Sequence, residues 1–323
     1  MKYSLLGRTG VRVSQLCFGA MSFGTTADED TSKKMFNRCR DVGINFFDCA
    51  NSYGHGEAER ILGRCLSGCR DEIVVCTKVS GVMGDGVNDH GLSRRHMMMQ
   101  VEASLTRLQT DRIDVYFLHH LDPSTPLEET LRALDDMVRQ GKIVYPAVSN
   151  WAAWQIATAL GISKRQGLAA FECIQPMYNL VKRQVEVEIL PLAAAENLGV
   201  ITYSPLGAGL LTGKYSTTKR PDSGRILESP LYIKRYEARQ YYEIAERFTA
   251  YAAERGYHPA TLAVAWAMTN PVVTAPIIGA RNLEQLEPSL AALDVEMTPE
   301  WRQEISALSI DPPPATDRTE EVM

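Results

Sequence analysis

Short apolar runs rich in β-branched and aromatic residues alternate along the chain with longer segments whose apolar residues recur at helical spacing. The runs predict eight strands, and the longer segments predict helices between them. The predicted strands are residues 15–18, 44–47, 73–76, 113–118, 143–148, 171–174, 200–203 and 273–278. The predicted helices include residues 30–41, 57–66, 93–108, 126–139, 185–197 and 283–293.

Residues at the ends of these helices support the assignment. Ser93 precedes one predicted helix and Gly141 follows another, as is typical of helix start and stop positions. Glu128 and Glu129 lie in a first turn, where the helix dipole favours negative charge.

Strands that are apolar almost throughout are typical of a parallel sheet covered by helices on both faces. Eight such units can close, and the fold class we predict is an α/β (β/α)8 TIM barrel. Outside the repeat we expect an N-terminal β-hairpin at residues 3–13 turning at 8–10, a long loop at 205–232, and extra helices at 236–255, 259–268 and 299–308. No linker divides the chain, so we expect one barrel domain over residues 1–310 and a disordered tail over 311–323.

Charge and cysteine usage exclude several classes of protein. The 34 basic and 39 acidic residues are interspersed and give a net charge of −5, which offers no electrostatic footprint for nucleic acid or an anionic membrane. No long uncharged apolar stretch or signal-like N-terminus is present, and the seven cysteines lack the paired spacing of a zinc or redox motif. We therefore expect a cytoplasmic protein with reduced thiols that binds neither nucleic acid nor membrane. The six histidines lack any metal-ligand spacing, so we expect no metal site.

Ionisable residues stand where three consecutive predicted strands end. Asp48 and Tyr53 follow the second strand, Lys78 follows the third, and His119 follows the fourth. Because the reactive groups of such barrels lie at the carboxyl ends of the strands, these four side chains are the candidate catalytic residues. His120 is adjacent, and we expect one histidine of the pair to face outward.

The chemistry of the four groups is complementary. We expect the Lys78 ammonium to lower the pKa of the Tyr53 phenol, and Asp48 to compensate the charge of Lys78. His119 can donate a hydrogen bond to a carbonyl oxygen near Tyr53. The set therefore predicts a site that gives a proton to an oxygen on which negative charge develops.

A glycine-rich segment, GAGLLTG, follows the seventh predicted strand and contains Gly207, Gly209 and Gly213. Glycine-rich loops are common, but barrels often bind phosphate at the loops after strands seven and eight. Lys214 comes directly after this segment, so a phosphate site is predicted there. No GxGxxG fingerprint follows the first strand.

With these motifs the sequence resembles the aldo-keto reductase superfamily, in the branch of bacterial reductases and potassium-channel β-subunits. The resemblance rests on GINFFDCANSYGHGEAERILG, VVCTKV, RIDVYFLHHLD, AVSNW, IQPMYNL, YSPLGAGLLTGKY and IIGARNLEQLEPS, in this order. It implies NADPH-dependent reduction of aldehydes or ketones, with Tyr53 as general acid, Lys78 and Asp48 tuning it, and His119 orienting the carbonyl.

The resemblance also implies which residues hold NADPH/NADP⁺. Ser149, Asn150 and Gln175 would hold the carboxamide, Tyr203 would stack on the nicotinamide, and Arg281 would meet the 2′-phosphate. The remaining implied cofactor positions are Gly19, Met21, Ser204, Leu206, Gly209, Lys214, Arg225, Gly279 and Gln285.

The family branch leaves a second function open, that of a nucleotide-binding redox sensor or assembly subunit with slow turnover. A metal-dependent barrel hydrolase or isomerase is disfavoured by the missing ligand spacing.

We expect the pocket walls to come from residues 21–26, 79–91, the region after His120 and the C-terminal segment. Met21, Phe23, Met83, Trp151 and Tyr178 are candidates for an apolar wall. The short proline-rich tail favours a small or sugar-like carbonyl substrate, and the oligomeric state stays open.

Overall fold

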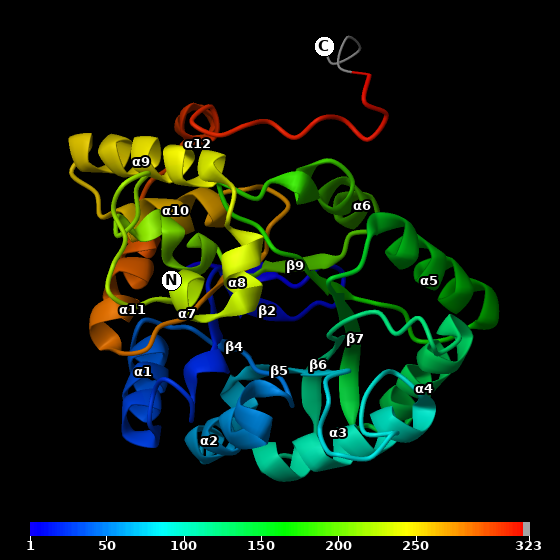
Figure 1. Ribbon diagram of the computed structural model, residues 1–323. Helices are drawn as coiled ribbons and strands as arrows, with labels where there is room; N and C mark the ends of the chain where they lie inside the picture. The colour runs from blue at the N-terminus through cyan, green and yellow to red at the C-terminus, as the bar shows by residue number, and fades with distance from the viewer. Residues whose placement is uncertain (319–323) are drawn as a thin grey trace.

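Eight parallel strands close into a barrel that is surrounded by helices (Figure 1). The computed structural model describes residues 1–318. Neighbouring strands pair in the order β10, β3, β4, β5, β6, β7, β8, β9 and back to β10. The strands are β3 (Cys17–Gly19), β4 (Phe46–Asp48), β5 (Val74–Val79), β6 (Ile113–Leu118), β7 (Ile143–Ser149), β8 (Cys173–Gln175), β9 (Gly199–Thr202) and β10 (Ala275–Ile278). The predicted (β/α)8 TIM barrel is confirmed.

The helices alternate with the strands as the apolar pattern predicts. Side chains of Asp28, Ser93, Asn282 and Thr298 accept a backbone N–H at the start of four helices, which satisfies donors that have no partner inside the helix. The helices beside the barrel are α1 (Glu29–Asp41), α2 (Glu57–Leu66), α3 (Arg94–Leu108), α4 (Leu127–Arg139), α5 (Ala153–Gln166), α6 (Ile189–Ala195) and α11 (Leu283–Leu290). The additional helices are α7 (Arg225–Glu228), α8 (Pro230–Arg235), α9 (Arg239–Glu254), α10 (Pro259–Met268) and α12 (Pro299–Ser306).

One prediction about these elements is wrong. The segment 205–232 is not an irregular loop, because it contains a 3-10 turn (Gly207–Thr212), the whole of α7 and the start of α8. Prolines and glycines break the segment into pieces too short to show a helical period.

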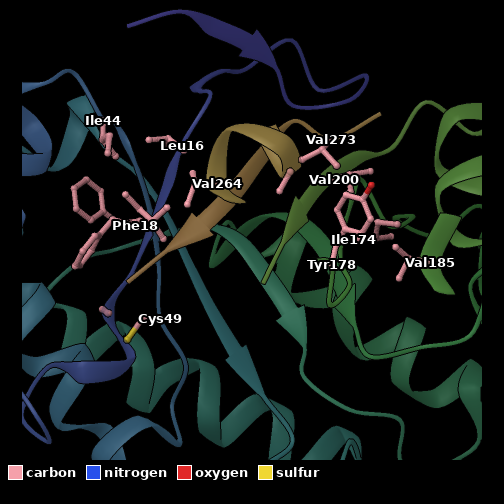
Figure 2. Close-up of a cluster of buried hydrophobic side chains, with 14 of the residues drawn as sticks. Leu16, Phe18, Ile44, Cys49, Ile174, Tyr178, Val185, Val200, Val264 and Val273 are labelled. Carbon is pink, nitrogen blue, oxygen red and sulfur yellow. The ribbon is translucent and has the colours of Figure 1, made fainter. Parts of the chain in front are cut away.

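The core has two layers. Outside the barrel, side chains such as Phe18, Ile44 and Val264 are buried between the strands and the helices (Figure 2). Inside it, Cys17, Phe46, Cys76, Val115 and other small or apolar side chains fill the lumen. The barrel is therefore a packed core rather than a pore.

The predicted N-terminal hairpin is present as β1 (Tyr3–Leu5) paired antiparallel with β2 (Arg12–Ser14). Leu6 and Val13 pack into the lumen cluster, and Arg8 forms an ion pair of 2.7 Å with Glu172, which lies just before β8. The hairpin thus closes the amino-terminal end of the barrel. Only the opposite end, where the strands finish, is left for a ligand.

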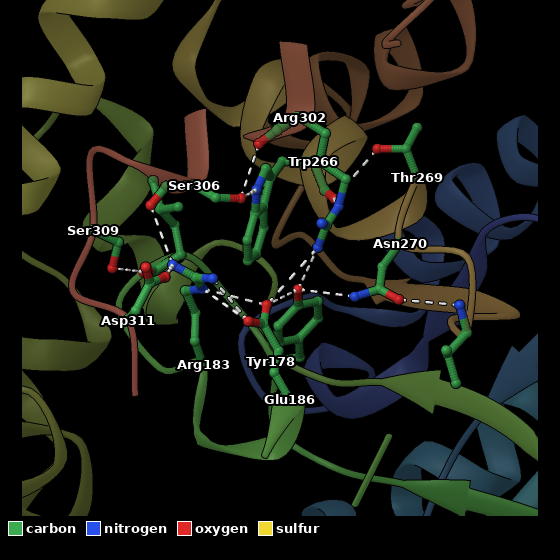
Figure 3. A network of polar contacts seen from close by, with 12 residues as sticks. Tyr178, Arg183, Glu186, Trp266, Thr269, Asn270, Arg302, Ser306, Ser309 and Asp311 are labelled. Atoms are coloured by element: carbon green, nitrogen blue, oxygen red, sulfur yellow. Dashed lines mark hydrogen bonds and ion pairs between the residues drawn. The ribbon is translucent and has the colours of Figure 1, made fainter. Parts of the chain in front are cut away.

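A partly buried polar network holds α12 against the segment after β8 (Figure 3). The Tyr178 hydroxyl accepts hydrogen bonds from Arg302 (2.6 Å) and Asn270 (3.1 Å) and donates one to Glu186. Arg183 pairs with Glu186 and reaches Asp311 at 2.6 Å. Residues 311–318 contain no helix or strand, and 319–323 lie outside the described residues, so the disordered tail stays a prediction.

Within residues 1–318 no helix is both long and apolar enough to cross a bilayer.

Two glycines inside helices provide a matched test of the packing. A Cβ on Gly63 of α2 would lie 2.6 Å from the Arg107 carbonyl oxygen of α3, whereas a Cβ on Gly161 of α5 would meet only the flexible end of Arg165 at 3.3 Å. Gly63→Ala should therefore lower the free energy of unfolding by about 1–3 kcal/mol, because the backbone of α3 must move. Gly161→Ala should raise it by up to about 1 kcal/mol, because alanine favours helix. Urea unfolding measures both changes, and a Gly63→Ala variant as stable as wild type would contradict the packing.

Candidate active site

The barrel register brings the predicted strand-end residues to one level. Gly19 pairs with Asp48 and Asp48 with Cys76, and Ser149 at the end of β7 pairs with Gln175 at the end of β8. His119 directly follows β6, and its backbone N–H bonds to the carbonyl of Val79. The polar side chains therefore gather at the carboxyl ends of the strands, as predicted.

Asp48 and Lys78 form an ion pair inside this end of the barrel. The Lys78 Nζ lies 2.5 Å from Asp48 Oδ2, 2.7 Å from the carbonyl oxygen of Cys49 and 3.4 Å from the Tyr53 hydroxyl. Asp48 Oδ1 accepts a further hydrogen bond of 2.9 Å from Gln175. Lys78 is fully buried and Asp48 is 3% exposed, so each charge depends on these partners.

Tyr53 is positioned by a tight turn between β4 and α2. Gly54, His55 and Gly56 have φ values of 56°, 51° and 89°, in the left-handed region that glycine adopts most readily. A Cβ on Gly56 would lie 2.7 Å from the Arg107 side chain, so glycine is also required there for space. The turn directs the phenol ring to Lys78, whose Nζ is 5.0 Å from the ring centroid.

The net pKa shift of Tyr53 is opposite to the expected one. Burial raises the pKa of the phenol, Lys78 lowers it, and the net result is a pKa of about 12. Burial is the largest influence on Lys78 and lowers its pKa, but Asp48, Tyr53 and Cys49 together outweigh burial and hold the pKa of Lys78 above its usual value. At neutral pH the site therefore contains a protonated phenol next to an ammonium ion.

The two adjacent histidines both line the site. The His119 ring meets Tyr53 edge-on with centroids 6.0 Å apart, and it stacks on His120 with centroids 4.6 Å apart and planes 11° apart. Burial and then Lys78 lower the pKa of His119 to about 2, so its imidazole is neutral and can donate one hydrogen bond. Both rings line the cavity, but His120 is exposed to solvent whereas His119 is only partly exposed, which agrees with the expectation that one histidine of the pair faces outward.

A second set of hydrogen bonds lies beside the four catalytic candidates. Ser149 Oγ donates to the Gln175 carbonyl at 2.8 Å, and Asn150 Nδ2 donates to the His119 carbonyl at 2.9 Å. The Tyr203 hydroxyl donates to Asn150 Oδ1 at 2.7 Å. These hydrogen bonds link the ends of β6, β7, β8 and β9 along one side of the site.

A cavity of about 730 Å³ opens at this end of the barrel, within the range of about 300–1,000 Å³ that small-molecule sites occupy. All of the predicted site residues line it except Lys78, which is fully buried behind Asp48 and Tyr53. Those residues are Gly19, Met21, Asp48, Tyr53, His119, Ser149, Asn150, Gln175, Tyr203, Ser204, Leu206, Gly209, Lys214, Arg225, Gly279, Arg281 and Gln285.

The part of the cavity after β9 has features of an anion site. Gly207, Ala208 and Gly209 have successive positive φ values of 56°, 57° and 99°, and the turn is held by hydrogen bonds that the backbone N–H groups of Gly207 and Gly209 donate to the carbonyls of Ser204 and Leu206. A Cβ on Gly209 would meet nothing closer than 3.9 Å, so space is open there. Lys214 lines the same part, and no ion pair of its side chain is found within residues 1–318.

Arg281 faces this space from the segment after β10. One of its guanidinium nitrogens lies 3.5 Å from Glu228 of α7, so α7 and the start of α11 approach each other across the cavity. The Gln285 side chain accepts a hydrogen bond from the Arg281 backbone at 3.3 Å.

The walls of the cavity differ from the predicted ones. Of residues 21–26 only Met21 and Ser22 line it, and residues 79–91, the region after His120 and the described C-terminal segment do not. Met21 is also the only lining residue among the five predicted apolar wall residues; Phe23 and Tyr178 are instead fully buried in the core. The segment 205–235 supplies the wall, including Leu231, Tyr232 and Arg235 of α8, which sequence analysis missed. The only available signal was the proximity of these residues in sequence to GAGLLTG.

No group of three or more His, Cys, Asp or Glu side chains that could hold a metal ion occurs in residues 1–318.

Comparisons with known proteins agree with this architecture. The model of the Aldo/keto reductase family matches residues 15–310. The chain is 38% identical over 311 positions to the "Uncharacterized oxidoreductase YrpG" of Bacillus subtilis, covering 93% of each protein. It is 40% identical over 329 positions to a "Probable voltage-gated potassium channel subunit beta" of Oryza sativa subsp. japonica, covering 98% of this chain and 99% of that one. It is also 31% identical over 326 positions to "Versiconal hemiacetal acetate reductase" of Aspergillus parasiticus, covering 93% of this chain and 94% of that one.

Proposed function

Because the chain belongs to the aldo/keto reductase family of oxidoreductases, we propose that it reduces aldehydes or ketones to alcohols with NADPH. The observation that carries the proposal is the convergence of Asp48, Tyr53, Lys78 and His119 at one end of a cavity whose other end has the features of a phosphate site.

The residues present fit a nicotinamide dinucleotide phosphate. Gly19 and Gly279 lie together on the cavity floor, where a Cβ on Gly279 would stand only 3.5 Å from the Gly19 carbonyl oxygen. Asn150 and Gln175 offer amide groups to a carboxamide, and Tyr203 offers an aromatic face beside them. Further along, Lys214, Arg225 and Arg281 line the cavity beside the turn at Gly207–Thr212 and offer charged N–H donors to phosphates.

When bound, a reduced nicotinamide supplies the hydride that forms the new C–H bond, so that a carbonyl compound, NADPH and one proton give an alcohol and NADP⁺. The residues of this chain do the rest. Neutral His119 donates a hydrogen bond to the carbonyl oxygen and holds it beside the phenol of Tyr53. Tyr53, which is protonated at neutral pH, gives its proton to that oxygen as negative charge develops.

Lys78 and Asp48 make proton transfer from the Tyr53 phenol easier. The ammonium lies 3.4 Å from the Tyr53 oxygen, so it stabilises the phenolate that remains after proton transfer. Asp48 keeps Lys78 charged and, through Gln175, ties that charge to β8. The pKa of about 12 already includes the effect of Lys78, so without the ammonium the pKa of the buried phenol would be higher still and the phenol would be a weaker acid. A proton from solvent then restores the phenol.

A second candidate is a nucleotide-binding subunit with slow turnover. It is favoured by the two plant relatives of 40% identity that are named as probable potassium channel β-subunits. The rate of NADP⁺ release separates the two functions, because a carbonyl reductase must release NADP⁺ at least as fast as it turns over.

Tyr53→Phe tests the general acid. We expect kcat for a simple aldehyde to fall about 10²- to 10⁴-fold, because a positioned proton donor contributes that much. The affinity for NADPH should change less than about twofold, since the ring is retained. Tyr145→Phe is the control, because its hydroxyl bonds to Thr9 at the closed end of the barrel. Unchanged turnover in Tyr53→Phe would refute the assigned role.

Arg281→Gln tests the cofactor preference. We expect the dissociation constant for NADPH, followed by fluorescence titration, to rise about tenfold or more through loss of a charge-assisted hydrogen bond, while that for NADH hardly changes. Arg239→Gln, an exposed substitution on α9, should leave both constants unchanged. A wild-type protein that binds NADH as tightly as NADPH would contradict the role of Arg281.

A further inference from the structure

The cavity carries more positive than negative charge, although the chain as a whole is acidic. Four cations line it: Lys214, Arg225, Arg235 and Arg281. The acidic lining residues are Asp48 and Glu284, and Asp48 is already neutralised by Lys78. The site is therefore suited to more than one anionic group.

Three of the four cations divide by the groups that they face, while Arg225 lies over the same Tyr232 ring as Arg235, 5.2 Å from its centroid. Arg281 approaches Glu228, and Lys214 acts on His258, so both belong to the proposed phosphate end. Arg235 instead acts on His120 and Tyr203, which lie at the carbonyl end. Burial and then Arg235 lower the pKa of His120, so its imidazole stays neutral and can donate a hydrogen bond.

Arg235 is held in place without being neutralised. Its guanidinium carbon lies 5.0 Å from the Tyr232 ring centroid, one turn earlier in α8. No carboxylate of residues 1–318 forms an ion pair with it. A guanidinium with free N–H groups can bind a carboxylate or phosphate in a bidentate manner.

A line of side chains joins this cation to the proposed general acid. The Tyr53 ring meets the His119 ring edge-on, and the His119 ring stacks on that of His120. The positive charge of Arg235 in turn lowers the pKa of His120. A molecule whose carbonyl oxygen lies between Tyr53 and His119 can thus extend along the two imidazoles toward α8.

We infer that Arg235, assisted by His120, forms a subsite for an anionic group on the substrate, so that the chain prefers aldehydes or ketones that carry a carboxylate or a phosphate at the end remote from the reacting carbonyl. This inference rests on the proposed reductase function. It assigns α8 a role in selecting the substrate rather than in holding NADPH.

The test compares two aldehydes that differ in charge but share the ring and the reacting group, 4-carboxybenzaldehyde and methyl 4-formylbenzoate. With NADPH as reductant, wild-type kcat/KM should be about tenfold or more higher for the acid. Arg235→Gln should remove most of this preference while leaving kcat/KM for the ester and KM for NADPH within about twofold. Lys234→Gln, an exposed neighbour outside the cavity, is the control and should behave as wild type.

Glyceraldehyde and glyceraldehyde 3-phosphate form a second pair that distinguishes phosphate from carboxylate recognition. A preference for either anion over its neutral partner, lost in Arg235→Gln, supports the subsite and identifies the group. Equal efficiency on charged and neutral partners in wild type, with turnover present, overturns the inference and leaves the proposed function standing. A raised KM for NADPH with both aldehydes equally affected also overturns it, because Arg235 would then serve the cofactor.

A binding measurement covers the case in which no aldehyde is reduced. Calorimetry with NADP⁺-loaded protein should show that 4-(hydroxymethyl)benzoate binds about tenfold more weakly to Arg235→Gln than to wild type. Equal binding to the two proteins would overturn the inference independently of catalysis.

Discussion

A buried ion pair between Asp48 and Lys78 is the interaction on which the site depends. A fully buried ammonium is stable only if its N–H groups have acceptors, and Lys78 has three: a carboxylate, a backbone carbonyl and the Tyr53 hydroxyl. The pair belongs to β4 and β5, which are hydrogen-bonded neighbours, so the barrel register sets its geometry. The turn at residues 54–56 places the phenol beside this pair, and burial keeps the phenol protonated although the ammonium favours the phenolate.

Because the barrel is filled and closed at one end, a ligand can bind only at the other end. There the segments that follow the strands form most of the cavity wall. The hairpin and the lumen side chains close the amino-terminal end. At the open end, β4 to β6 carry or precede the groups proposed to act on the carbonyl, β7 to β9 carry or precede those proposed to hold the nicotinamide, and residues 205–235 form a wall across the cavity. The wall carries the turn at Gly207–Thr212 on one side and α8 on the other, so one segment can contact both cofactor and substrate.

Sequence analysis predicted most of the fold because each strand is a short apolar run followed by a helical period, and the four catalytic candidates because each comes at or just beyond a strand end. It did not predict α8, since a helix of six residues that begins at Pro230 is too short to show a helical period. It also gave the wrong direction for the pKa of Tyr53, because spacing identifies the nearby ammonium but says nothing of burial. The stacking of His119 on His120 depends on how the chain turns after β6, which no local pattern encodes.

The most direct test of the account is a double-mutant cycle on the ion pair, measured as the free energy of unfolding in urea. Asp48→Asn and Lys78→Met should each destabilise the protein by about 3–5 kcal/mol, because each leaves the other charge buried and without its partner. The double variant should be more stable than the sum of the single effects implies by at least about 2 kcal/mol, since it buries no unpaired charge. Additive effects would contradict the account, because the two charges would then not depend on each other.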